Sequence, residues 1–263
     1  MNARAFLIRG LLAGLLAGFA AFGVAFVVGE PSVDKAIAIE EAGSAPAIAD
    51  HHGQAEAAEP GHTHGEVAVV SRQDQSTWGL LTGTVTVGVT IGGLLALVAA
   101  GVMGRVGRLS PATSTAVVAG IGYVSVALVP FLKYPAAPPA VGDPDTIVQR
   151  TALYFAFVLI SLGAAAVCTG AALRLRGAWG SQAAVLVGVG GYLAIVAIAG
   201  ALMPSVDEIG TFPGDVLWDF RLGSIFTSAA LWATVGGALV VMVGRLHAEH
   251  LALQARREFA RSL

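Results

Sequence analysis

Histidine side chains gather in one short tract of this otherwise apolar sequence. Residues 51–66 read HHGQAEAAEPGHTHGE and hold His51, His52, His62 and His64, four of the six histidines in the chain. His62 and His64 form an H-x-H pair, which in an extended backbone points both imidazoles to one side. Imidazole binds Co, Ni, Cu and Zn, and this spacing matches no closed structural zinc site. The tract predicts a weak, open metal site, and the alternative is a solvated polar loop that binds nothing.

Carboxylates just before this tract could add oxygen ligands. Residues 30–41 read EPSVDKAIAIEE and are typical of a short helix with Ser32 as its N-cap. Such a helix is either an amphipathic connector on the membrane surface or one that presents acids to the metal. The acids that would share one face are Glu30, Asp34 and Glu41.

Two further polar segments combine stiff or aromatic residues with acids. Residues 130–146 read PFLKYPAAPPAVGDPDT, and prolines such as Pro135 give the backbone an extended, defined shape. Residues 204–221 read PSVDEIGTFPGDVLWDFR and place four acids among aromatic side chains: Asp207, Glu208, Asp215 and Asp219. These acids are either solvated beside an interfacial aromatic belt or part of a rigid vestibule that attracts a divalent cation.

Composition assigns these segments to a membrane protein. Of the 263 residues, 56% are hydrophobic and 12% are charged, which excludes an ordinary soluble domain. Six stretches without Asp, Glu, Lys or Arg each have the roughly 20 residues that cross a bilayer. They are residues 10–29, 75–104, 109–132, 151–173, 177–206 and 222–244. We predict an all-α, polytopic transmembrane bundle of about six helices, with a short outer amphipathic helix and a C-terminal cytoplasmic helix.

The first helix has an alternative interpretation as a cleaved signal peptide, which would leave five. Arg4 and Arg9 form a basic segment before it, but its length and the pair Gly14 and Gly18 favour a retained helix. The predicted division is a first transmembrane helix in 1–29, an outer His/acid-rich loop 30–74, helices 75–104 and 109–132, a Pro-rich outer loop 133–150, helices 151–173 and 177–203, an acidic and aromatic outer loop 204–221, a sixth helix 222–244 and a tail 245–263.

Charge predicts the orientation of this bundle. Lys and Arg collect on the cytoplasmic side of membranes, and this topology places ten of the fifteen inside. Of the seventeen acids, only Glu249 and Glu258 lie inside. Both termini are therefore predicted to be cytoplasmic, and the acidic outer face would concentrate cations. Each outer loop is also followed by an arginine, Arg72, Arg150 or Arg221, which anchors a helix end or marks three similar hairpins.

The helices contain almost no ionisable residues. A permeating ion would be handled by hydroxyls, backbone carbonyls or water, unless another chain completes the pathway. Small residues permit close helix packing, and they include the pairs Gly14/Gly18, Gly79/Gly83 and Gly88/Gly92. No Walker A, G-x-S-x-G, H-E-x-x-H or Rossmann motif occurs, so we predict no enzyme, no permanent cofactor and no nucleic-acid partner.

The chain resembles the CbtA family of probable cobalt transporter subunits from bacterial membranes. The resemblance spans nearly the whole chain and rests on GEPSVDKAIAIEEA, SRQDQSTWGLLTG, PFLKYPAAPPAVGDPDTIVQRTALYF and PSVDEIGTFPGDVLWDFRLGS. It implies cobalt uptake linked to cobalamin metabolism and a small second membrane subunit, CbtB, with its own histidine motif. Besides the histidines, the matching positions are Glu30, Asp34, Glu40, Glu41, Lys133, Tyr134, Pro135, Asp143 and Asp145.

Together these observations favour a subunit of a divalent-metal uptake system in the bacterial inner membrane, with Co²⁺ or Ni²⁺ as the transported ion. The histidine loop would capture the metal and the helix bundle would pass it inward. The alternative is an accessory metal-binding, sensing or assembly protein that conducts nothing itself, which the lack of charge within the helices supports.

Overall fold

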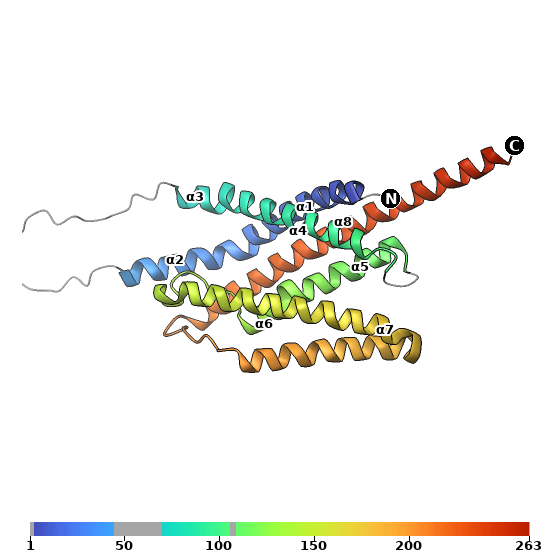
Figure 1. Cartoon of the computed structure of the whole chain (residues 1–263). Coiled ribbons are helices and arrows are strands. Elements are labelled where there is room, and N and C mark those ends of the chain that lie inside the picture. Colours follow the sequence, from blue (N-terminus) through green and yellow to red (C-terminus); the bar gives the residue numbers. More distant parts are fainter. Residues whose placement is uncertain (1–2, 45–69, 106–108, 263) are drawn as a thin grey trace, which may run out of the picture.

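The computed structural model describes residues 3–44, 70–105 and 109–262, and within these residues it contains helices and no β-strand. Figure 1 shows the long helices lying side by side in one bundle. The predicted all-α fold is confirmed. In chain order the elements are α1 (Ala3–Val24), the π-helical η1 (Ala25–Gly29), α2 (Glu30–Ser44), α3 (Arg72–Asp74), the π-helical η2 (Gln75–Gly79), α4 (Leu80–Val102), α5 (Pro111–Gly122), the π-helical η3 (Tyr123–Leu128), α6 (Val129–Lys133), the 3₁₀ turn η4 (Pro144–Thr146), α7 (Ile147–Leu202) and α8 (Gly214–Arg261).

Five helical runs in the described residues are long and apolar enough to cross a membrane, and the longest of them is broken into two arms. The helix α7 is broken at Gly180, whose φ of 80° and ψ of 166° suit a glycine and reverse the chain. Its two arms run antiparallel (Figure 1), and the hydroxyls of Ser161 and Tyr192 form a hydrogen bond of 2.8 Å between them. With α7 counted as two arms, the described helices are consistent with the six crossings that the sequence predicts.

An even number of crossings brings both chain termini to the same end of the bundle (Figure 1). We call this the terminal end, and it also carries residues 103–105 and the break in α7. We call the opposite end the loop end. It carries α2, α3, residues 134–143 and residues 203–213.

The tightest helix contact joins α1 to α4 through glycines. A Cβ atom on Gly14 would lie 2.2 Å from the carbonyl oxygen of Gly88, and one on Gly92 would lie 2.2 Å from that of Gly10. A Cβ atom on Gly18 would lie similarly close to the Cα atom of Val85, at 2.5 Å. Lipid tails are as apolar as leucine, so helices in a bilayer gain by close van der Waals packing, which small residues permit. The glycine spacing seen in the sequence is thus the α1–α4 interface.

Buried side chains form two clusters. The larger joins α1, α4, α5 and α8, where Ala13, Ala17, Val235 and Leu239 have no exposed surface. The smaller holds the two arms of α7 together around Cys168, which is buried. Since α1 supplies one wall of the larger cluster, its removal would expose the glycine face of α4, and this packing is the one expected of a retained helix.

The helix predicted over residues 30–41 is present, but its predicted start is wrong. The backbone continues through η1 into α2, with Glu30 at φ −54° and ψ −40°, so no helix begins at Ser32. Ser32 is buried and its hydroxyl donates to the carbonyl oxygen of Gly29 at 2.7 Å. A serine can bond backwards to the preceding turn in this way as well as cap a helix. The segment therefore extends α1 past the bundle and does not turn onto a surface.

The α1–α4 contact makes a first prediction. Gly92→Ala should lower the free energy of unfolding by about 1–3 kcal/mol, because the new methyl group meets backbone that cannot move without separating the helices. The measurement is unfolding by sodium dodecyl sulfate in mixed micelles, followed by circular dichroism. Gly101→Ala, in the same helix with open space around its Cβ position, is the matched control and should not destabilise. Equal stability of the two variants would contradict the contact.

Candidate functional site

An arginine at the start of the second crossing binds the acids that follow the first. The Arg72 guanidinium pairs with Glu30, and its Nη2 lies 2.9 Å from Oδ1 of Asp34. Its Nε also donates to Asp34 Oδ1 at 3.1 Å. Glu30 is the better enclosed acid, with 14% of its side chain exposed against 63% for Asp34. These ion pairs tie together the two ends of the segment that carries the histidines.

The other predicted metal residues of this region are placed as follows. Glu40 and Glu41 are exposed near the end of α2. His51, His52, His62 and His64 lie outside the described residues, as does most of the predicted histidine loop. Among the described residues, no group of three or more His, Cys, Asp or Glu side chains could hold a metal ion.

A cavity of about 600 Å³ lies between α1, α4 and α8, and it extends from the loop end into the bundle. We call it the bundle cavity. Its carboxylate is Glu30, and its hydroxyl groups come from α4 and α8: Thr84, Ser224, Thr227 and Ser228. The π-helical segments η1 and η2 line the part of the cavity nearest the loop end, through Ala25, Gly29 and Gly79. Such π-helical turns occur frequently at functional sites.

The cavity hydroxyls can present oxygen to a cation. Those of Thr84 and Ser224 donate to backbone carbonyls one turn earlier, at 2.9 Å each, so their lone pairs are left to accept or to coordinate. The floor of the cavity is apolar and contains Ile91, Leu231 and Trp232. The Trp232 ring stands at the α5–η3 junction, where a Cβ on Gly122 would touch it at 2.7 Å. The oxygen-bearing side chains therefore lie nearer the loop end of the cavity, and the apolar ones lie deeper in the bundle.

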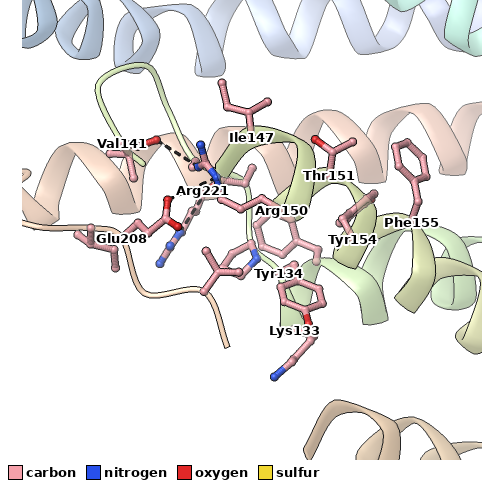
Figure 2. Close-up of a pocket in the computed structure, with 16 residues that line it drawn as sticks. Lys133, Tyr134, Val141, Ile147, Arg150, Thr151, Tyr154, Phe155, Glu208 and Arg221 are labelled. Carbon is pink, nitrogen blue, oxygen red and sulfur yellow. Dashed lines mark hydrogen bonds and ion pairs between the residues drawn. The ribbon is translucent and has the colours of Figure 1, made fainter. Parts of the chain in front are cut away.

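A second cavity, of about 540 Å³, lies between the Pro-rich loop, α7, residues 206–209 and α8. We call it the basic pocket, because its described lining carries Lys133, Arg150 and Arg221 against the single carboxylate of Glu208. In Figure 2, Arg150, Arg221 and Glu208 are drawn on one side of the pocket and the Lys133 amine points away from them. The cations come from three different elements, α6, α7 and α8.

Backbone carbonyls orient Arg150. Nη1 and Nη2 of Arg150 donate to the carbonyl oxygens of Val141 at 3.5 Å and Asp143 at 3.2 Å (Figure 2 draws the first). Its Nε lies 3.4 Å from Oε2 of Glu208, is buried and makes no hydrogen bond. Gly142, at φ 100°, lies directly against this guanidinium, since a Cβ there would meet Nη1 at 2.0 Å. The loop thus needs glycine at this position to seat the arginine.

Glu208 joins the two long loops. Its Oε2 accepts from the Asp143 N–H at 3.0 Å and from the Thr146 hydroxyl at 2.8 Å. These hydrogen bonds, with the charge of Arg150 nearby, hold the pKa of the Glu208 carboxyl below its ordinary value. Glu208, which the sequence predicts as a vestibule acid, therefore joins its own loop to residues 143–150. We call these contacts the clamp.

Lys133 and Tyr134 also connect the loops. The Lys133 amine donates to the carbonyl oxygen of Met203 at 3.3 Å, and the Tyr134 hydroxyl donates to that of Pro204 at 2.8 Å. Burial raises the pKa of the Tyr134 phenol, which keeps the proton that it donates. Pro135 follows them in the wall of the basic pocket.

The remaining predicted acids are exposed and do not converge. Asp143 accepts from the Asp145 N–H at 2.9 Å, and Asp219 lies 3.8 Å from Lys35. Asp207 and Asp215 form no ion pair within the described part of the chain. These carboxylates contribute charge to the loop end without forming a metal site among themselves.

Sequence reasoning missed the partner of the α2 acids and the lining of the bundle cavity. The sequence does contain a signal for the partner of the α2 acids. Arg72 begins the helix that follows the histidine loop, and this helix starts at the same end of the bundle where the preceding helix ends. Ser224, Thr227 and Ser228 follow one another at helical spacing in α8. Nothing in that spacing distinguishes a cavity wall from ordinary helix packing.

The clamp predicts a specific pH dependence. A carboxyl whose pKa is depressed in the folded state stabilises the fold above its unfolded pKa, about 4.5, and loses this effect as the pH falls through the folded value. Thermal unfolding of the purified protein between pH 7 and pH 3 should therefore show a loss of stability below about pH 4.5 that is smaller in Glu208→Gln. Asp207→Asn, which removes a neighbouring exposed carboxylate, should keep the wild-type profile. Identical profiles for all three proteins would contradict the clamp.

Comparison with known proteins adds the identity of the chain. A family model described as a probable cobalt transporter subunit (CbtA) matches residues 3–244. No curated protein and no solved structure matches the chain. The match covers all six crossings, the bundle cavity and the basic pocket, and a transporter subunit is not a class of enzyme. The chain therefore belongs to the CbtA family of probable cobalt transporter subunits.

Proposed function

We propose that this chain is the membrane subunit of a divalent-metal uptake system that captures Co²⁺, or the chemically similar Ni²⁺, at the loop end and passes it through the bundle cavity. The single observation that carries the proposal is the cavity between α1, α4 and α8, which opens at the loop end with Glu30 and continues along hydroxyl groups.

Orientation follows from charge on the two ends. Arg105, Arg174, Arg176 and Arg245 lie at the terminal end, as expected for a cytoplasmic face. The loop end then faces outward in the bacterial inner membrane, with the exposed acids of α2 and the loops around the cavity mouth. Their negative potential raises the local concentration of cations before any ligand binds.

The histidine tract supplies reversible capture in this scheme. The described residues before and after this tract are joined by the ion pairs of Arg72 with Glu30 and Asp34, and Glu30 also lines the cavity. A tethered weak site raises the effective metal concentration at the mouth and still releases the ion. Imidazole nitrogen selects transition metals over Ca²⁺ or Mg²⁺, which oxygen ligands favour.

Passage through the cavity uses neutral oxygen atoms. Thr84, Ser224, Thr227 and Ser228 can replace part of the hydration shell of the ion without holding it tightly. The paired Glu30 carboxylate offsets the cost of bringing a divalent charge toward low dielectric. In this scheme the stronger ligands, the histidines, lie outside the bundle, and the weaker ligands, the hydroxyl groups, lie inside the cavity.

The apolar floor at Ile91, Leu231 and Trp232 supports a second candidate function. With the cavity closed below, the chain could bind or sense metal as an accessory protein while a different subunit conducts. A transporter in its outward-open form would have the same closed floor. The proposed second subunit, a small CbtB-like membrane protein with its own histidines, could complete the pathway in either case.

Cobalt uptake tests the proposal. Labelled Co²⁺ uptake is measured in cells that lack their own cobalt importers and express the chain with or without the small partner, with nickel and zinc as competitors. Changing His51, His52, His62 and His64 together to alanine should reduce uptake at low cobalt and leave it nearly normal at high cobalt. Normal expression without cobalt accumulation, with or without the partner, would favour the accessory function.

A second variant tests the cavity itself. Glu30→Gln should reduce uptake at low cobalt by about fivefold, because an opposite charge at close range in water contributes about 1 kcal/mol. Glu41→Gln removes the same charge from the same helix outside the cavity and should have a clearly smaller effect. Equal losses in both variants would assign the effect to the general surface charge, and passage through this cavity would lose its support.

A further inference from the structure

The basic pocket has an excess of positive charge that no neighbouring acid balances. Among the described residues, neither Lys133 nor Arg221 forms an ion pair, and each donates only to a backbone carbonyl, of Met203 at 3.3 Å and of Ala136 at 3.4 Å. The carboxylate of Glu208 is already engaged by the clamp and by Arg150. A metal cation would be repelled from this pocket, so it is not part of the metal pathway.

The two guanidinium groups keep unused donors at the pocket. The Nη atoms of Arg221 make no hydrogen bond to the described residues, and the buried Nε of Arg150 has no acceptor within hydrogen-bonding geometry. Buried donors normally find an acceptor, and a planar guanidinium fork matches the oxygen atoms of a phosphate or carboxylate. The chemistry of the pocket therefore fits an oxyanion.

One wall of the pocket is apolar and open to the lipid side of the bundle. Ile147 and Phe155 lie on α7 with 53% and 58% of their surfaces exposed, and Phe131 adds a further apolar surface. The crossing begins at Ile147, so the cations lie at the level where a bilayer has its headgroups. Exposed apolar side chains next to unpaired cations at this depth match a molecule that has a phosphate and an acyl chain.

We propose that the basic pocket binds the phosphate of an anionic phospholipid, with the oxyanion against Arg150 and Arg221 and an acyl chain along Ile147 and Phe155. Free phosphate could make the same oxyanion contacts with the arginines, but it has no acyl chain to lie along Ile147 and Phe155. The bound lipid would hold α6, α7 and α8 together at the loop end, where few direct contacts join the α7 hairpin to the rest of the bundle.

Lipid binding to the purified, delipidated full chain tests the proposal without any metal. Native mass spectrometry measures the binding of short-chain phosphatidylglycerol, phosphatidylcholine and inorganic phosphate. We expect phosphatidylglycerol to bind most tightly. Arg221→Gln should weaken that binding about tenfold, because the phosphate loses a charge-assisted hydrogen bond to the guanidinium. Lys133→Gln together with Arg221→Gln should weaken it further.

The matched control is Lys35→Gln, which removes a loop-end cation that lies outside the pocket and should leave lipid binding unchanged. Circular dichroism and thermal unfolding confirm that each variant is folded, and Arg221 is chosen because it makes only one hydrogen bond to the described chain. Unchanged phosphatidylglycerol binding in folded Arg221→Gln would overturn the proposal. Inorganic phosphate that binds as tightly as phosphatidylglycerol, with the same loss in Arg221→Gln, would overturn the lipid as the source of the oxyanion.

Discussion

The close contact of α1 with α4 is the constraint on which the rest of the bundle depends. Three glycines of α1 meet the backbone of α4, and α8 packs against the same helix pair to complete the larger core. Because a bilayer provides no hydrophobic drive between helices, this backbone approach supplies the van der Waals energy. The contact ends near Gly18 and Val85. The bundle cavity lies beyond this point and also beside the contact, since Ile91 on its floor belongs to the same stretch of α4 as Gly88 and Gly92.

The loop end separates two kinds of polar chemistry. The bundle cavity has a carboxylate and neutral hydroxyls, and the basic pocket has cations oriented by backbone carbonyls. The ion pairs of Arg72 close the segment with the histidines, and Glu208 clamps the other two loops to each other. Glu30 lines the bundle cavity while it pairs with Arg72, and the exposed acids of α2 and the loops add negative charge around it.

The six predicted crossings follow from the length of the apolar runs and from their lack of charged residues. Length and absence of charge identify each crossing because a bilayer requires about 20 apolar residues and internal hydrogen bonds. The sequence also predicts a turn between the fourth and fifth crossings, but it places this turn at residues 174–176. The break lies later, at Gly180 and inside the predicted helix 177–203, because the helix continues through Arg174 and Arg176. The predicted start at Ser32 failed for a physical reason, because a serine that bonds back to the preceding turn has the same local sequence as a serine that caps a helix.

The sequence alone determined the membrane class, the all-α fold, the number of crossings and the family resemblance, because these depend on composition, run length and short motifs. Its glycine spacing indicated three candidate packing pairs, of which Gly14/Gly18 and Gly88/Gly92 form the α1–α4 interface and Gly79/Gly83 does not. Only the tertiary structure decided the partners of the charged residues: Glu30 and Asp34 meet Arg72, and Glu208 meets the backbone of Asp143. These pairs join residues 38 to 65 positions apart in the chain. Which charge meets which therefore depends on how the helices pack, and no local pattern encodes it.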